Sequence, residues 1–174
     1  MSKTSLVLTI LGQDRPGLVE QIAKLVADHH GNWLESRMAH LAGQFAGILR
    51  VEVDAAHAES LASSLRGLAQ SGLESIIHPD PAATPAANDN RPLLHLDLLG
   101  QDRPGIIREI SRVLASLGVN VEELNTECRA AAETGQPLFH AKAQLRLPPN
   151  VTEATLRCAL EAVAADLMVD VKLA

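Results

Sequence analysis

The spacing of apolar residues predicts a regular alternation of strands and helices in the first half of the chain. A continuous apolar run at 6–11 is too short for a useful helix, so we predict a strand buried on both faces. After Gly17, apolar residues recur at spacings of three and four, which predicts an amphipathic helix ending near Gly31. The same reasoning adds strands at 33–41 and 44–53 joined by a hairpin at 42–43, a helix at 56–70 and a strand at 73–78.

The second half of the chain repeats this order. Its predicted elements are a strand at 93–99, a helix from 105, strands at 120–130 and 137–147 around a turn at 133–135, a helix at 152–166 and a strand at 168–173. A βαββαβ unit folds as a four-stranded antiparallel sheet with two helices on one face, the ferredoxin-like arrangement. The pattern therefore predicts an α+β protein made of two such units.

An exact sequence repeat supports this division. The heptapeptide Leu-Gly-Gln-Asp-Arg-Pro-Gly occurs at 11–17 and again at 99–105, an offset of 88 residues, and Asn32 and Asn120 follow at the same offset. We interpret the chain as an internal duplication, with domains at 1–78 and 93–174. The segment 79–92 carries four prolines and no large apolar side chain, which predicts a semi-extended linker.

Each copy of the heptapeptide is predicted to join the first strand of its unit to the first helix. Asp14 is placed to cap free amides at the helix N-terminus, and Pro16 suits the first helical turn. Gly17 leaves the backbone open, so that exposed amides and the helix dipole favour a small carboxylate. The candidate ligand-binding residues are Gly12, Gln13, Asp14, Arg15, Pro16, Gly17 and Asn32, with Gly100, Gln101, Asp102, Arg103, Pro104, Gly105 and Asn120 in the second copy.

The same residues also fit a purely structural interpretation. Gly, Asp and Pro make a good strand-to-helix turn, although neither capping nor turning requires Gln13. Arg15 and its repeat Arg103 are either solvated or paired with acidic residues of a neighbouring unit. Asn32 offers an amide donor and acceptor for a zwitterion, but asparagine is also an ordinary residue at a helix exit.

Composition narrows the possible partners. The formal net charge is −6 and the basic residues form no run, which argues against direct binding to nucleic acid. Only Phe45, Phe139 and Trp33 are aromatic, so stacking platforms for single strands are scarce. The sequence shows neither a signal peptide nor a segment able to span a bilayer, and we expect a cytoplasmic protein.

Catalytic and metal chemistry find little support in the sequence. Cys128 and Cys158 lie outside any C-x-x-C motif, which indicates neither a disulfide framework nor a zinc ribbon. The adjacent His29 and His30 point apart at a helix end and cannot chelate as an i, i+4 pair would. No serine has a nucleophile motif around it. We expect no cofactor, no metal and no enzymatic activity.

The loop motif, the amphipathic helix and the asparagine that follows together resemble the ACT domain, a regulatory amino-acid-binding module. Two such units without a catalytic domain are most similar to the glycine cleavage system transcriptional repressor family. The resemblance implies that units pair side by side, within one chain or between two, with a small amino acid such as glycine or serine at the seam. It also implies action through a DNA-binding activator rather than through DNA itself.

Two alternatives remain open at this point: an ACT scaffold that binds no ligand, and a regulatory subunit of an amino-acid or one-carbon enzyme. The two copies also differ near the motif, because Arg108 replaces Glu20 and Glu122 replaces Leu34. The sequence leaves open whether the two sites differ in affinity or whether one of them is only structural.

Overall fold

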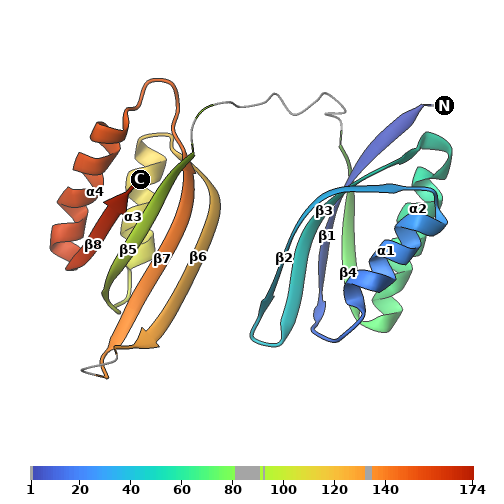
Figure 1. Ribbon diagram of the computed structural model, residues 1–174, viewed down its shortest axis with the longest axis horizontal. Coiled ribbons are helices and arrows are strands. Elements are labelled where there is room, and N and C mark those ends of the chain that lie inside the picture. Colours follow the sequence, from blue (N-terminus) through green and yellow to red (C-terminus); the bar gives the residue numbers. More distant parts are fainter. Residues whose placement is uncertain (1, 81–90, 92, 132–134) are drawn as a thin grey trace. The chain divides into compact units, whose positions relative to one another are not determined.

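A computed structural model describes residues 2–80, 91, 93–131 and 135–174 of the chain. The chain divides into two compact units, Met1–Asp89 and Asn90–Ala174 (Figure 1). Most of the predicted linker (81–90 and 92) and part of the turn predicted at 133–135 lie outside the described residues.

The first unit has the predicted βαββαβ order, with one short 3₁₀ helix added. Its elements are β1 (Lys3–Gln13), α1 (Leu18–Asp28), β2 (Asn32–Leu41), β3 (Gln44–Asp54), α2 (Ala55–Gly67), η1 (Leu68–Ser71) and β4 (Leu73–Asp80). The strands form one antiparallel sheet in the order β2-β3-β1-β4. Ala42 and Gly43, both with positive φ, make the two-residue hairpin turn between β2 and β3, as predicted.

The second unit repeats the arrangement. Its elements are β5 (Leu93–Gln101), α3 (Ile106–Ser116), β6 (Asn120–Ala130), β7 (Pro137–Arg146), α4 (Glu153–Leu167) and β8 (Val169–Leu173). The sheet order is β6-β7-β5-β8, which matches the first sheet strand for strand. The predicted fold class, two ferredoxin-like α+β units, is confirmed.

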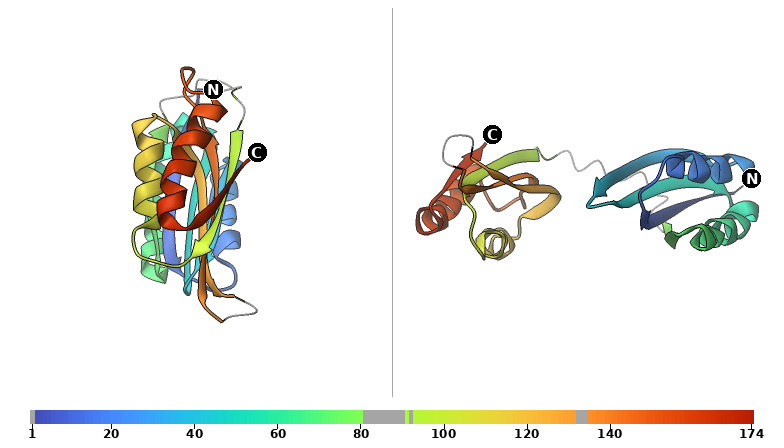
Figure 2. Two further views of the ribbon diagram at one scale, coloured as in Figure 1. Left: turned by 90° about the vertical axis from the view of Figure 1, so that its left-hand side faces the viewer. Right: turned by 90° about the horizontal axis from the view of Figure 1, so that it is seen from below.

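The helices of each unit cover one face of its sheet and leave the other face open (Figure 2). The first helix of each unit buries three residues at the same offset of 88: Leu18, Ile22 and Val26 in α1, and Ile106, Ile110 and Leu114 in α3. Each unit has its own cluster of buried apolar residues. No helix in the described part of the chain has both the length and the apolarity needed to cross a membrane.

One prediction about burial is wrong. β1 is not buried on both faces: Leu8 and Ile10 are almost fully buried, whereas Leu11 is 48% exposed. The physical reason is that helices pack on only one face of the sheet, so successive side chains alternate between core and solvent. The continuous apolar run therefore predicts a strand correctly here, but it does not show that both faces of the strand are buried.

The last strand of the first unit also extends further than predicted. β4 continues through Pro79 and Asp80, which pair with Leu6 and Ser5 of β1. Proline is tolerated in β4 because β4 is an edge strand, and an edge strand has no neighbouring strand on its outer side that would need a backbone N–H donor. The first two residues assigned to the linker are therefore part of the sheet.

Candidate functional site

The repeated heptapeptide joins β1 to α1 and β5 to α3. Each helix has a glycine as its N-cap residue, Gly17 with φ 91° and Gly105 with φ 98°, both left-handed. A side chain at either position would meet no other atom within 4 Å, so glycine is required by the backbone conformation and not by crowding. No side chain caps the first amides of either helix.

The first glycine of each loop has a different role. A Cβ built on Gly12 would lie 2.5 Å from the carbonyl oxygen of Gly72, and one on Gly100 would overlap Val169. Both positions adjoin the start of the last strand of their unit, which is packed directly against the loop. Gly12 and Gly100 are therefore required for packing, whatever else the loop binds.

The prediction that Asp14 and Asp102 cap the helices is wrong. The N-cap position is three residues further on, at glycine, and Pro16 and Pro104 precede that glycine and lie outside the first helical turn. The Asp14 amide instead donates to the Gly43 carbonyl at 2.9 Å, which ties the loop to the β2–β3 hairpin. The left-handed glycine reverses the chain before the helix begins, which leaves the aspartate on the strand side of the turn.

The two aspartate side chains turn toward the neighbouring edge strand. Asp14 Oδ2 lies 3.6 Å from His40 Nε2 on β2. The Asp102 carboxylate lies close enough to the thiol of Cys128 on β6 to raise its pKa, and Cys128 occupies the position equivalent to His40. Neither His40 nor Cys128 was identified as a neighbour of the loop from the sequence. The offset of 88 residues that links Asn32 to Asn120 also links His40 to Cys128.

The environment of Cys128 favours the protonated form of its thiol. Desolvation raises the pKa of Cys128 above its usual value, and the negative charge of Asp102 and its hydrogen bond raise the pKa further. A raised pKa lowers the thiolate fraction at neutral pH. Cys128 is itself exposed on β6, beside the loop.

The arginines of the motif have structural partners in their own unit. Arg15 Nη2 donates to the Ser71 carbonyl at 3.1 Å and to Gln21 Oε1 at 3.3 Å. Arg103 Nη2 donates to the Asp166 carbonyl. Both carbonyls lie at the C-terminal end of a helix, where exposed carbonyl oxygens carry partial negative charge. Each arginine thus fastens its loop to the end of the second helical segment.

The structure does not bring the predicted asparagine to the loop of the same unit. Gln13, beside the loop, pairs with Gln44 of β3, whereas Asn32 pairs with Glu52, eight residues further along that strand. At about 3.3 Å per residue, the two positions are separated by about 26 Å. The second unit shows the same separation, because Gln101 pairs with Leu138 and Asn120 with Arg146.

The surroundings of the two asparagines differ. Asn120 Nδ2 donates to Glu122 Oε1 at 2.9 Å, and the same oxygen accepts a bond from Arg146 Nε at 3.0 Å. The Asn32 side chain, by contrast, makes no hydrogen bond within the described residues. Gln101 Nε2 lies 3.4 Å from Gln136 Oε1, a bond that Gln13 lacks in the described part of its own unit.

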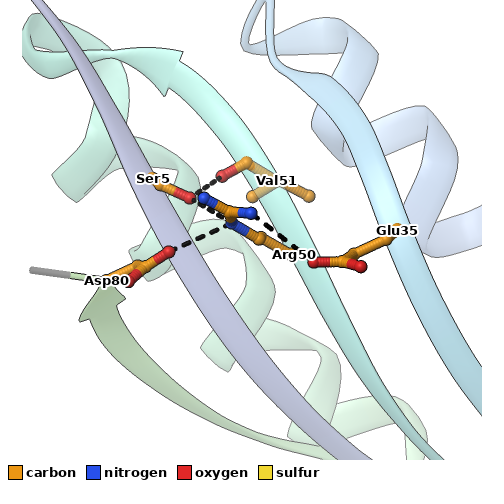
Figure 3. A network of polar contacts seen from close by, with 5 residues as sticks. All are labelled: Ser5, Glu35, Arg50, Val51 and Asp80. Carbon is orange, nitrogen blue, oxygen red and sulfur yellow. Dashed lines mark hydrogen bonds and ion pairs between the residues drawn. The ribbon is translucent and has the colours of Figure 1, made fainter. Parts of the chain in front are cut away.

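A charged network on the open face of the first sheet was not anticipated from the sequence (Figure 3). Arg50 Nε lies 3.0 Å from Asp80 Oδ2 and 3.2 Å from Ser5 Oγ, and Arg50 Nη1 lies 3.5 Å from Glu35 Oε1. These residues come from four different strands, so the network joins β1, β2, β3 and β4 at the end of the sheet opposite the loop.

The open face of the second sheet is polar and carries a shallow hollow of about 310 Å³ that includes none of the predicted residues. Its polar lining is His95, Asp97, Glu123, Asn125, Lys142 and Gln144. Beside it, His140 lies 3.1 Å from Asp97 and 3.3 Å from Glu127. Within the described ranges, no group of three or more His, Cys, Asp or Glu side chains is placed to hold a metal ion.

Comparisons with known proteins agree with this architecture. Residues 4–74 match the model of the ACT domain. An unknown protein from Galdieria sulphuraria is 28% identical, with a TM-score of 0.86 over 99% of this chain and 98% of that chain. A candidate glycine cleavage system transcriptional repressor is 18% identical, with a TM-score of 0.73 over 100% and 98%. No curated protein sequence matches the chain at a significant level.

The second likeness concerns the fold alone, since the identity is low. It nevertheless extends over both units, whereas the matched ACT residues fall in the first. The second unit has the same element order, sheet order and loop sequence as the first. The first unit therefore matches the ACT domain over residues 4–74, and the second unit repeats the same fold.

Proposed function

We propose that this protein senses a small amino acid, most simply glycine, and regulates transcription through a protein partner. The observation that carries the proposal is the pair of identical loops in which α1 and α3 begin at Gly17 and Gly105 without a side-chain cap. The first amides of a helix have no intrahelical acceptor, and they favour a carboxylate. We place this sensor in the cytoplasm, and its role is regulatory rather than catalytic.

The separation of loop and asparagine defines how such a ligand would be held. The loop and the asparagine of one unit are separated by about 26 Å, which a glycine molecule cannot bridge. One unit therefore cannot supply both the loop amides and the asparagine to the same ligand. Two ACT units that pair along their edge strands in opposite directions would place the loop of one beside the asparagine of the other. β2 and β6 are edge strands and are mostly exposed, which supports this mode of pairing.

Ligand binding at such a seam would act by linkage. An amino acid that contacts both units stabilises the paired arrangement in which both contacts exist, and it shifts the population by its differential affinity. Asp14 and Arg15 connect the loop to the hairpin and to the end of η1, so a displaced loop would disturb both elements. The surface presented to a partner would change accordingly.

The choice of partner is supported by charge and by likeness. A net charge of −6 disfavours contact with a phosphate backbone, which argues for a protein partner. The whole-length likeness to a candidate glycine cleavage system transcriptional repressor supports a role in transcription. The partner that we propose is a DNA-binding activator.

Calorimetric titration of the full chain with glycine tests the proposal, with serine and alanine as comparators. Saturable binding of glycine, with serine weaker, would support the sensor. Size-exclusion chromatography with and without glycine would then report whether occupancy changes the pairing of units. The absence of heat and of thermal stabilisation with all three amino acids would overturn the proposal.

One observation favours a second candidate, a scaffold that binds no ligand. Gly12, Arg15 and Gly17 all have structural roles in the loop, so the motif needs no ligand to explain it. A scaffold would show no response to amino acids while still forming a stable assembly. Capture of a metabolic enzyme instead of a transcription factor would indicate a regulatory subunit.

A further inference from the structure

The two asparagine positions are built alike but differ at one neighbouring residue. In each unit the pairing register shifts just after the asparagine, between Trp33 and Glu35 and between Val121 and Glu123. The extra residue at this bulge is Leu34 in the first unit and Glu122 in the second. A bulge redirects side chains at an edge strand, so the residue it carries sets the surroundings of the asparagine.

In the second unit this residue binds the asparagine. The Asn120 amide donates to Glu122 Oε1 at 2.9 Å, and Arg146 Nε holds the same carboxylate oxygen at 3.0 Å. Arg146 is itself restrained, because its side chain is only 17% exposed and its Nη1 donates to the Arg91 carbonyl at 2.9 Å. The carboxylate is therefore positioned and not a loose surface group.

In the first unit the equivalent carboxylate does not exist. Leu34 cannot accept a hydrogen bond, and the Asn32 amide has no partner within the described residues. The charged residue across the strand, Glu52, is held by Lys3 at 2.5 Å. Asn32 thus keeps both its donor and its acceptor for a ligand.

We propose that Glu122 disables the second asparagine, so that each chain binds its amino acid through Asn32 and not through Asn120. This inference rests on the proposed function, and it adds the residue that makes the two copies unequal. A ligand carboxylate at Asn120 would have to displace Glu122 from the amide, which costs an existing hydrogen bond. Leu34 makes no such bond to Asn32, so no displacement is needed there.

Stoichiometry tests this directly, because a merely structural role of Glu122 would not change the number of sites. Titration of the full chain with glycine should give one site per chain. Glu122→Leu, which copies the first unit, should raise this to two, and adding Asn120→Ala to that variant should return it to one. Glu123→Leu is the matched control: it removes the neighbouring carboxylate, which bonds Asn125 and Gln144, and should leave one site.

Two alanine variants test the inference without altering the ion pair. Asn32→Ala should weaken glycine binding at least about tenfold, the effect of losing hydrogen bonds to a charged group. Asn120→Ala should change neither the affinity nor the stoichiometry. Both side chains are exposed on edge strands, so the variants should fold normally.

The outcomes separate this inference from the function on which it rests. Two equal sites in the unmodified chain, or a loss of binding in Asn120→Ala, would overturn the role of Glu122 and leave the sensor intact. A Glu122→Leu protein that folds and still binds one glycine would do the same. If no variant and no unmodified chain binds glycine, serine or alanine, the proposed function fails together with the inference.

Discussion

Gly12 and Gly17 lie in the same loop but constrain the chain in different ways. Gly12 is required because a side chain would collide with the backbone of Gly72, whereas Gly17 is required for its positive φ. The first constraint is steric and the second is conformational, and neither involves a ligand. The distinction matters because each predicts its own pattern of tolerated substitutions.

Gly12→Ala should lower the free energy of unfolding by roughly 1–3 kcal/mol, since the added methyl group overpacks a rigid contact. Gly67→Ala is the control: Gly67 has φ −61°, and an added methyl group there would meet no other atom, so alanine should stabilise by about 0.4–1 kcal/mol. Urea denaturation followed by the fluorescence of Trp33, the single tryptophan, reports on this unit. Equal effects of the two substitutions would contradict the packing role of Gly12.

Cys128 gives a prediction that depends on pH. Because its pKa is raised, the folded protein should alkylate this thiol with iodoacetamide more slowly at pH 8 than the same chain unfolded in denaturant. Asp102→Asn removes the charge that stabilises the protonated form, so the midpoint of the pH–rate curve should move to lower pH. A Cys158→Ser background isolates the signal. Identical curves with and without the Asp102→Asn substitution would refute the contact.

At the scale of the elements, the helix ends are stabilised in different ways. α1 and α3 begin at left-handed glycines without a side-chain cap, whereas Thr152 caps α4 by accepting a bond from the Thr155 amide at 3.2 Å. The helix predicted from residue 152 does begin at this cap, whereas the caps predicted at Asp14 and Asp102 are not formed. A capping residue type near a helix start does not by itself identify the cap.

Thr152→Ala should therefore cost about 1 kcal/mol of stability, the usual value of a lost N-cap. Asp14→Ala should change the free energy of unfolding by less than about 0.5 kcal/mol, as expected for an exposed side chain. Circular dichroism during urea denaturation measures the first effect, and Trp33 fluorescence measures the second. Restoration of stability by Thr152→Ser would confirm that the hydroxyl is responsible. A large loss of stability in Asp14→Ala would contradict the structure and indicate that Asp14 caps α1.

The order of elements could be predicted because hydrophobic periodicity and turn residues act locally. The helix stripe beginning at Leu18 and the Ala42-Gly43 hairpin turn both appear in the structure as expected. What failed depended on distant contacts: which face of β1 is covered, and what the Asp14 carboxylate meets. The partners of Arg15 and Arg103 are backbone carbonyls, which sequence patterns do not reveal.

The separation of Asn32 from the loop could have been predicted from the topology of the sheet. In the sheet order β2-β3-β1-β4, β1 and β2 are both antiparallel to β3 and so run in the same direction. The start of β2 must then lie at the opposite end of the sheet from the end of β1. Proximity along the chain, with only α1 between them, had suggested a shared site.

At the scale of the whole molecule, each unit has the parts of an independent domain. The two apolar clusters draw every member from a single unit. Fragments 1–80 and 91–174 should therefore each fold cooperatively, although units of this size are only modestly stable. Dispersed amide NMR spectra and a sigmoidal urea transition for each fragment would verify this. A fragment that is unfolded alone would show that its core depends on the other unit.

The three structural demands on the loop have an evolutionary consequence. Gly12 must admit the neighbouring strand, Arg15 must reach the end of η1, and Gly17 must reverse the backbone. After a gene duplicates, selection for folding alone is enough to preserve such a motif in both copies. Identity between the loops is then explained by their shared fold. Differences in ligand recognition between the two copies are expected at the less constrained positions beside the asparagines, where Leu34 and Glu122 have diverged.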